Sequence, residues 1–303
     1  MKKIFIFGTT ILVCVVLGFA SQFHWKSCAE QVLIADTTAG FNTDAAAKSL
    51  REIERSIRDV EKRNDKEYIT ECCKIFRKSY PYPKVFEDRY NAYSEHLASN
   101  VADCSSGVLT LLHISQLQGL LGPYVIRLPG HVVFGLASEP NMWMESETCT
   151  WHSRTDIWTR YPTKPESILS KAFGELYARD RILAIYYARL GNRLLKLGKH
   201  TEGKRYLWNS TRPDAWDISG ISSLADVLVK SKLEQEVKEG IRLLAWSISL
   251  NTTPEENEAL AKLYISQKKW SEARDLLTKA VSCFPANESL KELKKIACKQ
   301  AKC

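Results

Sequence analysis

The chain has 303 residues, of which 45% are hydrophobic and 26% are charged. This composition excludes an intrinsically disordered or purely fibrous protein, and the length allows about two domains. The formal net charge of +8 comes from basic residues that are interleaved with Asp and Glu, which predicts a solvated surface. We therefore expect no nucleic acid among the partners.

The N-terminus has the pattern of a targeting sequence. Lys2 and Lys3 precede an uncharged run up to Ala20, where small residues suit cleavage. Residues 1–20 are predicted to be a signal peptide. A membrane anchor is the alternative, because the uncharged stretch reaches the roughly 20 residues of a span if it extends to Trp25. Both readings predict export to the periplasm or the cell exterior, with attachment to the inner membrane in the second.

The cysteine content agrees with an exported protein. Loss of Cys14 with the signal would leave eight of the nine cysteines, an even number that an oxidising compartment can pair. Cys72 and Cys73 are adjacent and cannot bridge each other without strain. A bridge within the group Cys283, Cys298 and Cys303 is one option. The irregular spacing predicts no connectivity.

The next part of the chain, residues 21–165, is expected to form an α+β domain. Apolar residues at helical spacing predict helices over 44–63, 66–78, 85–99 and 104–119. Turn residues separate three extended runs, which predict strands over 124–128, 132–136 and 142–147. A buried helix followed by consecutive strands indicates an antiparallel sheet that packs on that helix.

Residues 166–303 are expected to form an all-α helical repeat. One register of the roughly 34-residue tetratricopeptide pattern accommodates Ala261, Tyr264, Ala273, Leu277, Ala280 and Pro285. Weaker copies of the register start at Gly191, which also places Gly203, and at Leu228. Small residues are needed where the two helices of a unit cross. An unrelated helical bundle is the alternative, because amphipathic helices share much of this pattern.

A cysteine and a histidine occupy the ends of predicted elements. Cys104 starts the helix over 104–119, with Asp103 before it as a capping residue. The partial positive charge at a helix N-terminus favours the thiolate, which is the nucleophilic form. His131 follows a Pro-Gly turn at the head of a strand, where its imidazole could accept the thiol proton.

A third group must orient this imidazole. Glu145 lies on the next predicted strand, where antiparallel pairing could bring its carboxylate beside His131. Glu147 points to the same face by strand alternation and is the alternative. No further ligands occur at zinc-like spacing, so we expect neither a metal nor a cofactor.

The order of these residues resembles the transglutaminase-like superfamily, and is most similar to its bacterial branch with C-terminal tetratricopeptide repeats. The resemblance covers residues 91–148 closely, although the acidic strand lacks the Asp-Pro or Glu-Thr-Thr run of the family. It implies a papain-like core with a Cys-His-Asp or Cys-His-Glu triad. The corresponding residues here are Cys104, His131 and Glu145.

The expected function is acyl transfer at a peptide or amide bond. Cys104 would attack the carbonyl, His131 would act as base and then acid, and Glu145 would orient the imidazole. Water as acceptor gives a peptidase or amidase, and an amine gives a transglutaminase. The alternative is a non-catalytic scaffold whose repeats bind a peptide or protein. A third reading, a peptidoglycan-directed enzyme, follows only from the compartment and the aromatic cluster Trp143, Trp151, Trp158 and Tyr161, for which core packing is the competing interpretation.

Overall fold

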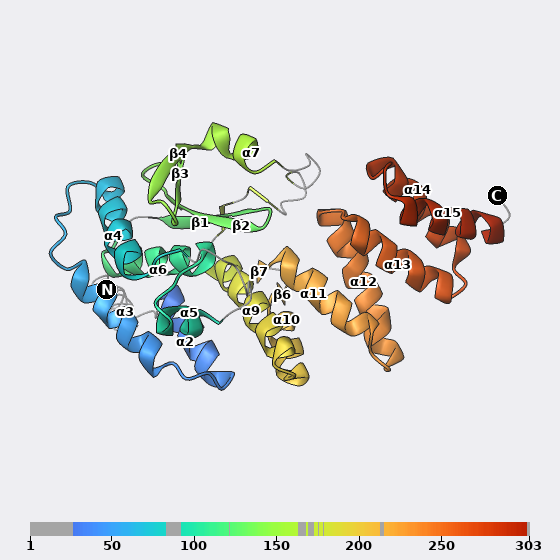
Figure 1. The fold of residues 1–303 in the computed structure, drawn as a ribbon, viewed down its shortest axis with the longest axis horizontal. Coiled ribbons are helices and arrows are strands. Elements are labelled where there is room, and N and C mark those ends of the chain that lie inside the picture. Colours follow the sequence, from blue (N-terminus) through green and yellow to red (C-terminus); the bar gives the residue numbers. More distant parts are fainter. Residues whose placement is uncertain are drawn as a thin grey trace, which may run out of the picture.

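The structure is a computed structural model that describes residues 27–82, 92–120, 122–162, 168, 173–174, 176–177, 179–212 and 215–301. The predicted signal or anchor at 1–20 lies outside these residues, as does the first part, 85–91, of the helix predicted over 85–99; the described remainder contains a shorter helix, Tyr93–Ala98. Within the described part, no helix combines the length and apolar character that a membrane span requires. The fold class is α+β, as predicted: a small antiparallel sheet and its helices form one end, and further helices extend away from them (Figure 1).

The N-terminal helices are α2 (Cys28–Thr38), α3 (Asp44–Ser56), α4 (Asp65–Ser79), α5 (Tyr93–Ala98) and α6 (Cys104–Leu117). Helix α2 was not predicted; it begins at a capping box in which Ser27 and Glu30 bond to each other's backbone N–H groups. Helix α3 ends earlier than predicted. The charged residues that follow it are mostly exposed, while Ile57 and Val60 still pack against the core as part of a turn.

The sheet has the order β4-β3-β2-β1-β5, with every neighbouring pair antiparallel. Its strands are β1 (Pro123–Leu128), β2 (His131–Leu136), β3 (Met142–Glu145), β4 (Thr150–Ser153) and the two-residue β5 (Leu176–Tyr177). Gly130 has φ +67° in the tight turn that joins β1 to β2, a conformation that glycine adopts without strain. The third predicted strand is shorter than expected. It ends at Glu145, and the chain turns back into β4, which was not predicted.

Helix α6 lies against one face of the sheet and carries much of the main core (Figure 1). Side chains from β1 and β2 meet α6, and helices α2, α3 and α4 enclose it. The other face of the sheet has its own apolar cluster, in which Trp143 is fully buried and contacts the short helix α7 (Ile157–Arg160). For Trp143, core packing is therefore the correct interpretation.

The C-terminal helices are α9 (Arg179–Lys196), α10 (His200–Asn209), α11 (Ile218–Val229), α12 (Glu234–Leu250), α13 (Pro254–Ser266), α14 (Trp270–Cys283) and α15 (Glu288–Ala301). Short strands β6 (Thr211–Arg212) and β7 (Ala215–Trp216) lie between α10 and α11. Consecutive helices pack in pairs, α9 with α10, α11 with α12, and α13 with α14.

The small residues of the predicted repeat register lie at close helix contacts. A Cβ added to Gly191 would come within 2.8 Å of the Leu207 side chain and 3.0 Å of the Gly203 carbonyl oxygen. Ala261 and Ala273 are fully buried together in the last helix pairs. These contacts explain why the positions require small side chains, while assignment to the tetratricopeptide family stays a prediction.

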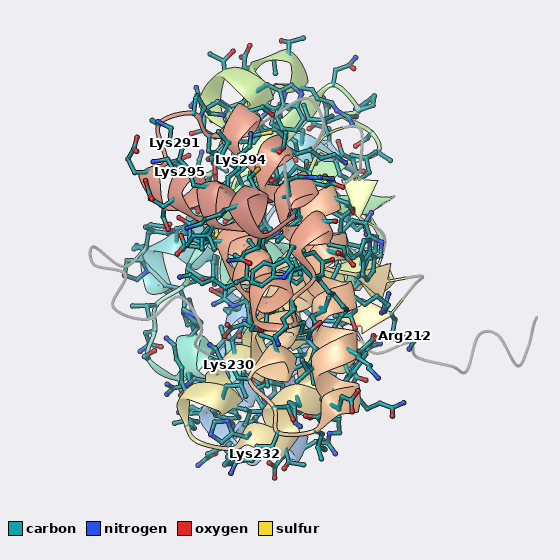
Figure 2. The ribbon with its side chains drawn as sticks, turned by 90° about the vertical axis from the view of Figure 1, so that its right-hand side faces the viewer. Arg212, Lys230, Lys232, Lys291, Lys294 and Lys295 are labelled. Atoms are coloured by element: carbon teal, nitrogen blue, oxygen red, sulfur yellow. A yellow bond between two sulfur atoms is a disulfide. The ribbon has the colours of Figure 1, made fainter. Side chains whose placement is uncertain are left out.

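Many surface cations of this region have an acidic neighbour on the same helix. Lys230 pairs with Asp226 at 2.7 Å and Lys291 with Glu288 at 2.7 Å. Figure 2 shows that the lysines of α15 and those at the α11–α12 junction lie apart on this end of the molecule. The described positive charge is thus distributed and locally compensated.

One disulfide joins Cys73 on α4 to Cys149 in the turn after β3. Cys72, the neighbour of Cys73, is a buried free thiol. Of the C-terminal group, Cys283 is an exposed free thiol and Cys303 lies outside the described residues. The bridge fixes the turn that follows Glu145 to the helical layer.

Candidate functional site

Cys104 occupies the first position of α6, where the helix amides have no partner within the helix. Asp103 caps the helix, because one of its carboxylate oxygens accepts the backbone N–H of Ser106 at 2.8 Å. Cys104 is a free, partly exposed thiol. Its sulfur therefore lies at the positive end of the helix and within reach of solvent.

His131 lies at the start of β2 and faces the end of β3. Its Nε2–H donates to Glu145 at 2.7 Å, so antiparallel pairing of the two strands brings imidazole and carboxylate together. The second oxygen of Glu145 accepts the hydroxyl of Tyr161 at 2.5 Å. The Tyr161 ring also stacks on the imidazole, with ring centroids 4.9 Å apart. The His131 ring is thus held by a hydrogen bond and by a stacking contact.

The thiol, the imidazole and a second carboxylate meet in front of the sheet. The Cys104 sulfur, a ring nitrogen of His131 and a carboxylate oxygen of Glu147 all lie within 4.8 Å of one another. Because Nε2 is bonded to Glu145, Nδ1 is the nitrogen that can accept the thiol proton. Glu147 Oε1 lies 3.7 Å from this Nδ1.

The structure thus brings together all the residues singled out from the sequence. Glu145 contacts Nε2, which is the orienting position. Glu147 reaches the other side of the imidazole, although it lies in the turn and not on a strand. Glu147 therefore lies near His131, as predicted, but strand alternation is not the cause, because β3 ends at Glu145.

The charged groups of the site shift one another's pKa values. Burial alone would lower the pKa of His131, but its interactions with Cys104 and Glu145 outweigh burial and raise that pKa to about 10. Burial would raise the pKa of Glu145, but the hydrogen bond and charge of His131 lower it instead. For Glu147 burial prevails and raises the pKa to about 7. The pocket therefore favours a charged imidazolium beside Glu145.

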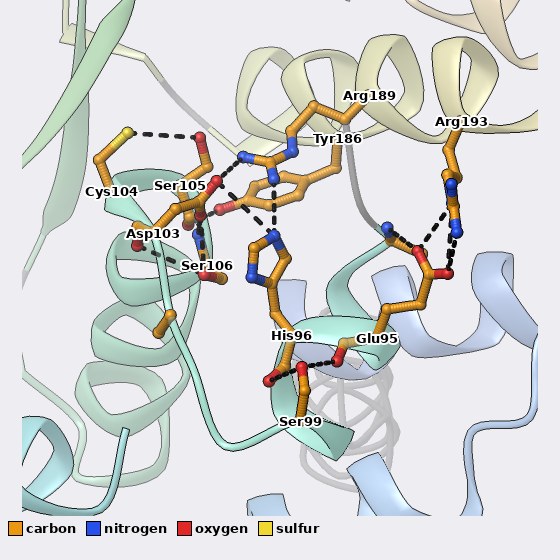
Figure 3. Close-up of polar contacts among 12 residues, drawn as sticks. Glu95, His96, Ser99, Asp103, Cys104, Ser105, Ser106, Tyr186, Arg189 and Arg193 are labelled. Atoms are coloured by element: carbon orange, nitrogen blue, oxygen red, sulfur yellow. Dashed lines mark hydrogen bonds and ion pairs between the residues drawn. The ribbon is translucent and has the colours of Figure 1, made fainter. Parts of the chain in front are cut away.

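A second polar cluster supports α6 from behind the thiol (Figure 3). Arg189 on α9 donates to the buried carboxylate of Asp103 at 2.7 Å and to His96 at 3.1 Å. Tyr186, also on α9, donates its hydroxyl to the carbonyl oxygen of Ser105. Burial would raise the pKa of Asp103, but the charges of Arg189 and His96 together with the hydrogen bonds from Ser106 outweigh it and hold this pKa well below its usual range. The helical region therefore fixes the start of the cysteine helix.

Arg77 on α4 connects the two segments that flank the thiol. Its guanidinium donates to the carbonyl oxygens of Ala102, just before α6, and of Ser146, just after β3, at 2.5 Å each. Burial lowers the pKa of Arg77, although the charges of Glu147 and Asp103 oppose this effect. One half-buried cation thus helps to set the position of the cysteine relative to the glutamates.

Three supporting residues were missed in the sequence: Arg77, Tyr161 and Arg189. From the sequence, Tyr161 is predicted only to pack in the core or to line a groove. Arg189 lies on a helix that was assigned to the repeat region, and nothing in its local pattern distinguishes it from a surface arginine. Only the tertiary contacts give these residues their roles.

No known protein-family model matches the chain, and no curated protein sequence matches it.

Proposed function

We propose that the protein is an exported, transglutaminase-like, cysteine-dependent acyl-transfer enzyme that acts on peptide or amide bonds of a peptide or protein. The observation that carries the proposal is the placement of the Cys104 sulfur and a His131 ring nitrogen within 4.8 Å, with the other side of the imidazole bonded to Glu145. A nucleophile, a base and an orienting carboxylate in this order are what covalent acyl transfer requires.

The reaction would proceed in two stages. His131 Nδ1 takes the thiol proton, and the Cys104 sulfur attacks the carbonyl carbon of the amide. The imidazolium then returns its proton to the leaving amine, and a thioester remains on the enzyme. Water or a second amine attacks this thioester with His131 as base, and the thiol is regenerated when the acyl group leaves. The α6 backbone amide at Cys104 is the proposed donor to the carbonyl oxygen during both attacks.

Two observations support the accompanying assignments. The disulfide between Cys73 and Cys149 is the kind of bond that persists in oxidising compartments, which supports export. The small-residue contacts between paired helices support the tetratricopeptide assignment of residues 166–303.

Thiol labelling tests the proposal without knowledge of the substrate. The full chain is treated with limiting iodoacetamide at mildly acidic pH, and the modification of each cysteine is followed by peptide mass spectrometry. Cys283, an exposed free thiol remote from the site, is the internal reference. We expect Cys104 to react at least about tenfold faster than Cys283, because only a thiolate is nucleophilic.

His131→Ala should abolish this advantage, whereas the matched control His152→Ala should keep it. His152 is another imidazole on the same sheet, and its ring contacts Trp143 in a tilted arrangement, with centroids 4.7 Å apart. If Cys104 reacts no faster than Cys283 in the wild type, or if His131→Ala changes nothing, the enzyme proposal fails. The alternative, a scaffold that binds peptides or proteins through its helices, would then be preferred.

A further inference from the structure

The cluster in front of α6 offers three different ligand atoms to one point in space. Among the described residues, Cys104, His131 and Glu147 form a group whose sulfur, nitrogen and oxygen are all within 4.8 Å of one another. Thiolate, imidazole and carboxylate are the three side-chain ligands of protein-bound zinc. The same three side chains could therefore bind a metal ion.

We propose that Cys104, His131 and Glu147 form a reversible binding site for a borderline-soft divalent cation such as Zn²⁺, and that the bound ion blocks the thiol. Binding itself is independent of the proposed reaction; only the inhibition rests on it. The ion competes with protons for all three ligand atoms, so binding releases protons to solvent and weakens as the pH falls.

The distances fit a tetrahedral ion after a small movement. Zinc bonds of about 2.0 to 2.3 Å place adjacent ligand atoms of a tetrahedron about 3.4 Å apart. Nδ1 of His131 and Oε1 of Glu147 are already 3.7 Å apart. The Cys104 sulfur lies at most 4.8 Å from each of these two atoms. A rotation of the Cys104 side chain would bring it closer. Three protein ligands leave the fourth position to water, as at metal sites that are open to solvent.

The surroundings of two ligands favour a cation. Glu147 Oε1 is buried and accepts no hydrogen bond from the residues that the structure describes, so a cation would relieve an unsatisfied acceptor. On the far side of His131, Nε2 donates to Glu145 at 2.7 Å. A carboxylate in this position fixes the ring and strengthens the other nitrogen as a metal ligand. Glu145 would thus orient His131 both as a base and as a metal ligand.

The cobalt ion provides a direct spectroscopic probe. The full chain, with its disulfide intact, is freed of metal by a chelator, dialysed and titrated with Co²⁺. We expect an intense thiolate-to-cobalt absorption in the near ultraviolet that saturates at one ion per chain and disappears when Zn²⁺ is added. Cys104→Ala should lack it. A wild type without this absorption, or an absorption that persists in Cys104→Ala, overturns the proposal.

Glu147→Gln separates metal binding from a simple thiol effect. We expect its Zn²⁺ affinity, measured by competition with a fluorescent chelator, to fall by about tenfold or more, because losing a ligand costs at least as much as losing an outer partner. The matched control is Glu71→Gln, an exposed carboxylate on α4 that should leave the affinity unchanged. Equal affinities in wild type and Glu147→Gln would remove Glu147 from the site and overturn the proposal as stated.

Protection of the thiol distinguishes this proposal from the proposed function. For each variant, the labelling rate of Cys104 is compared with and without Zn²⁺, and a chelator should restore the rate. Fast labelling that Zn²⁺ does not slow contradicts the metal site and leaves the acyl-transfer proposal standing. Slow labelling without metal contradicts the acyl-transfer proposal, while the cobalt absorption still decides the metal site.

Discussion

Two imidazole–carboxylate pairs lie on either side of the first turn of α6, and they differ in what completes them. Behind the thiol, Asp103 and His96 both contact the guanidinium of Arg189, so the carboxylate's charge is neutralised in a buried setting. In front, Glu145 is bonded by His131 and by a neutral hydroxyl. The front carboxylate therefore stabilises charge on its imidazole, whereas the back carboxylate anchors a helix.

We expect the cluster behind the thiol, Asp103, His96 and Arg189, to determine the stability of the fold. The cluster in front, Glu145, His131 and Tyr161, should determine the reactivity of the thiol. A buried carboxylate that loses its cation must bear the full cost of desolvation. Glu145 would keep its hydrogen bond to His131 if the Tyr161 hydroxyl were removed. The free energy of unfolding should therefore change little. Substitutions in the two clusters should thus affect different measurements.

Arg189→Ala is expected to have the largest effect. Removing the guanidinium leaves Asp103 buried without its cation, which should cost about 3–5 kcal/mol of unfolding free energy in urea denaturation. Arg193→Ala is the matched control: it lies one turn along α9 and pairs with Glu95 in a more exposed position. That variant should lose less, roughly 1 kcal/mol, because its ion pair is only partly buried and water can reach Glu95 once the guanidinium is removed. Equal losses in the two variants would contradict the anchoring role.

Asp36→Asn should have an intermediate effect that depends on pH. Asp36 on α2 faces the same cluster; its carboxylate accepts the Ser94 N–H at 2.8 Å. Burial, aided by the charge of Glu95 and opposed by that of Arg189, raises its pKa from 3.8 to about 6. The folded state therefore binds the proton more tightly than the unfolded state does.

The stability that this proton provides is complete below the unfolded pKa and is lost as the pH rises through about 6. Asn cannot ionise, so Asp36→Asn should gain on the order of 3 kcal/mol relative to wild type between acidic and neutral pH. Parallel stability–pH curves from thermal denaturation of the two proteins would contradict this expectation.

Tyr161→Phe should have the smallest effect on stability and a measurable one on reactivity. The variant keeps the stacked ring but removes the hydroxyl that donates to Glu145 at 2.5 Å. Labelling of Cys104 should slow roughly tenfold, which corresponds to about 1.4 kcal/mol for one hydrogen bond to a charged group.

The matched control is Tyr124→Phe. Its hydroxyl donates to the Met142 carbonyl oxygen at 3.2 Å, on the same sheet but away from the imidazole. It should leave the labelling rate unchanged. A slower rate in both variants would mean that the sheet as a whole, and not Glu145, controls the thiol.

The sequence predicted what local patterns encode. Apolar spacing gave α4 and α6, and the Pro-Gly turn gave the hairpin that places His131. Strand β4 was missed because its residues are mostly part-exposed and show no clean alternation. The contact between Arg189 and Asp103 joins residues that are far apart in the chain. No local pattern reports such a contact, because only the packing of α9 onto the N-terminal core creates it.

The disulfide between Cys73 and Cys149 spans a separation of 76 residues, and this segment contains Cys104, His131 and Glu145. During oxidative folding the chain must therefore close a covalent ring that contains Cys104, the proposed nucleophile, while keeping that thiol out of the bond. Refolding from the reduced state should yield mispaired isomers in which Cys104 is trapped with either partner. Thiol–disulfide exchange would then set the yield of correctly bridged protein, so the folding pathway would determine how much of the protein keeps Cys104 as a free thiol.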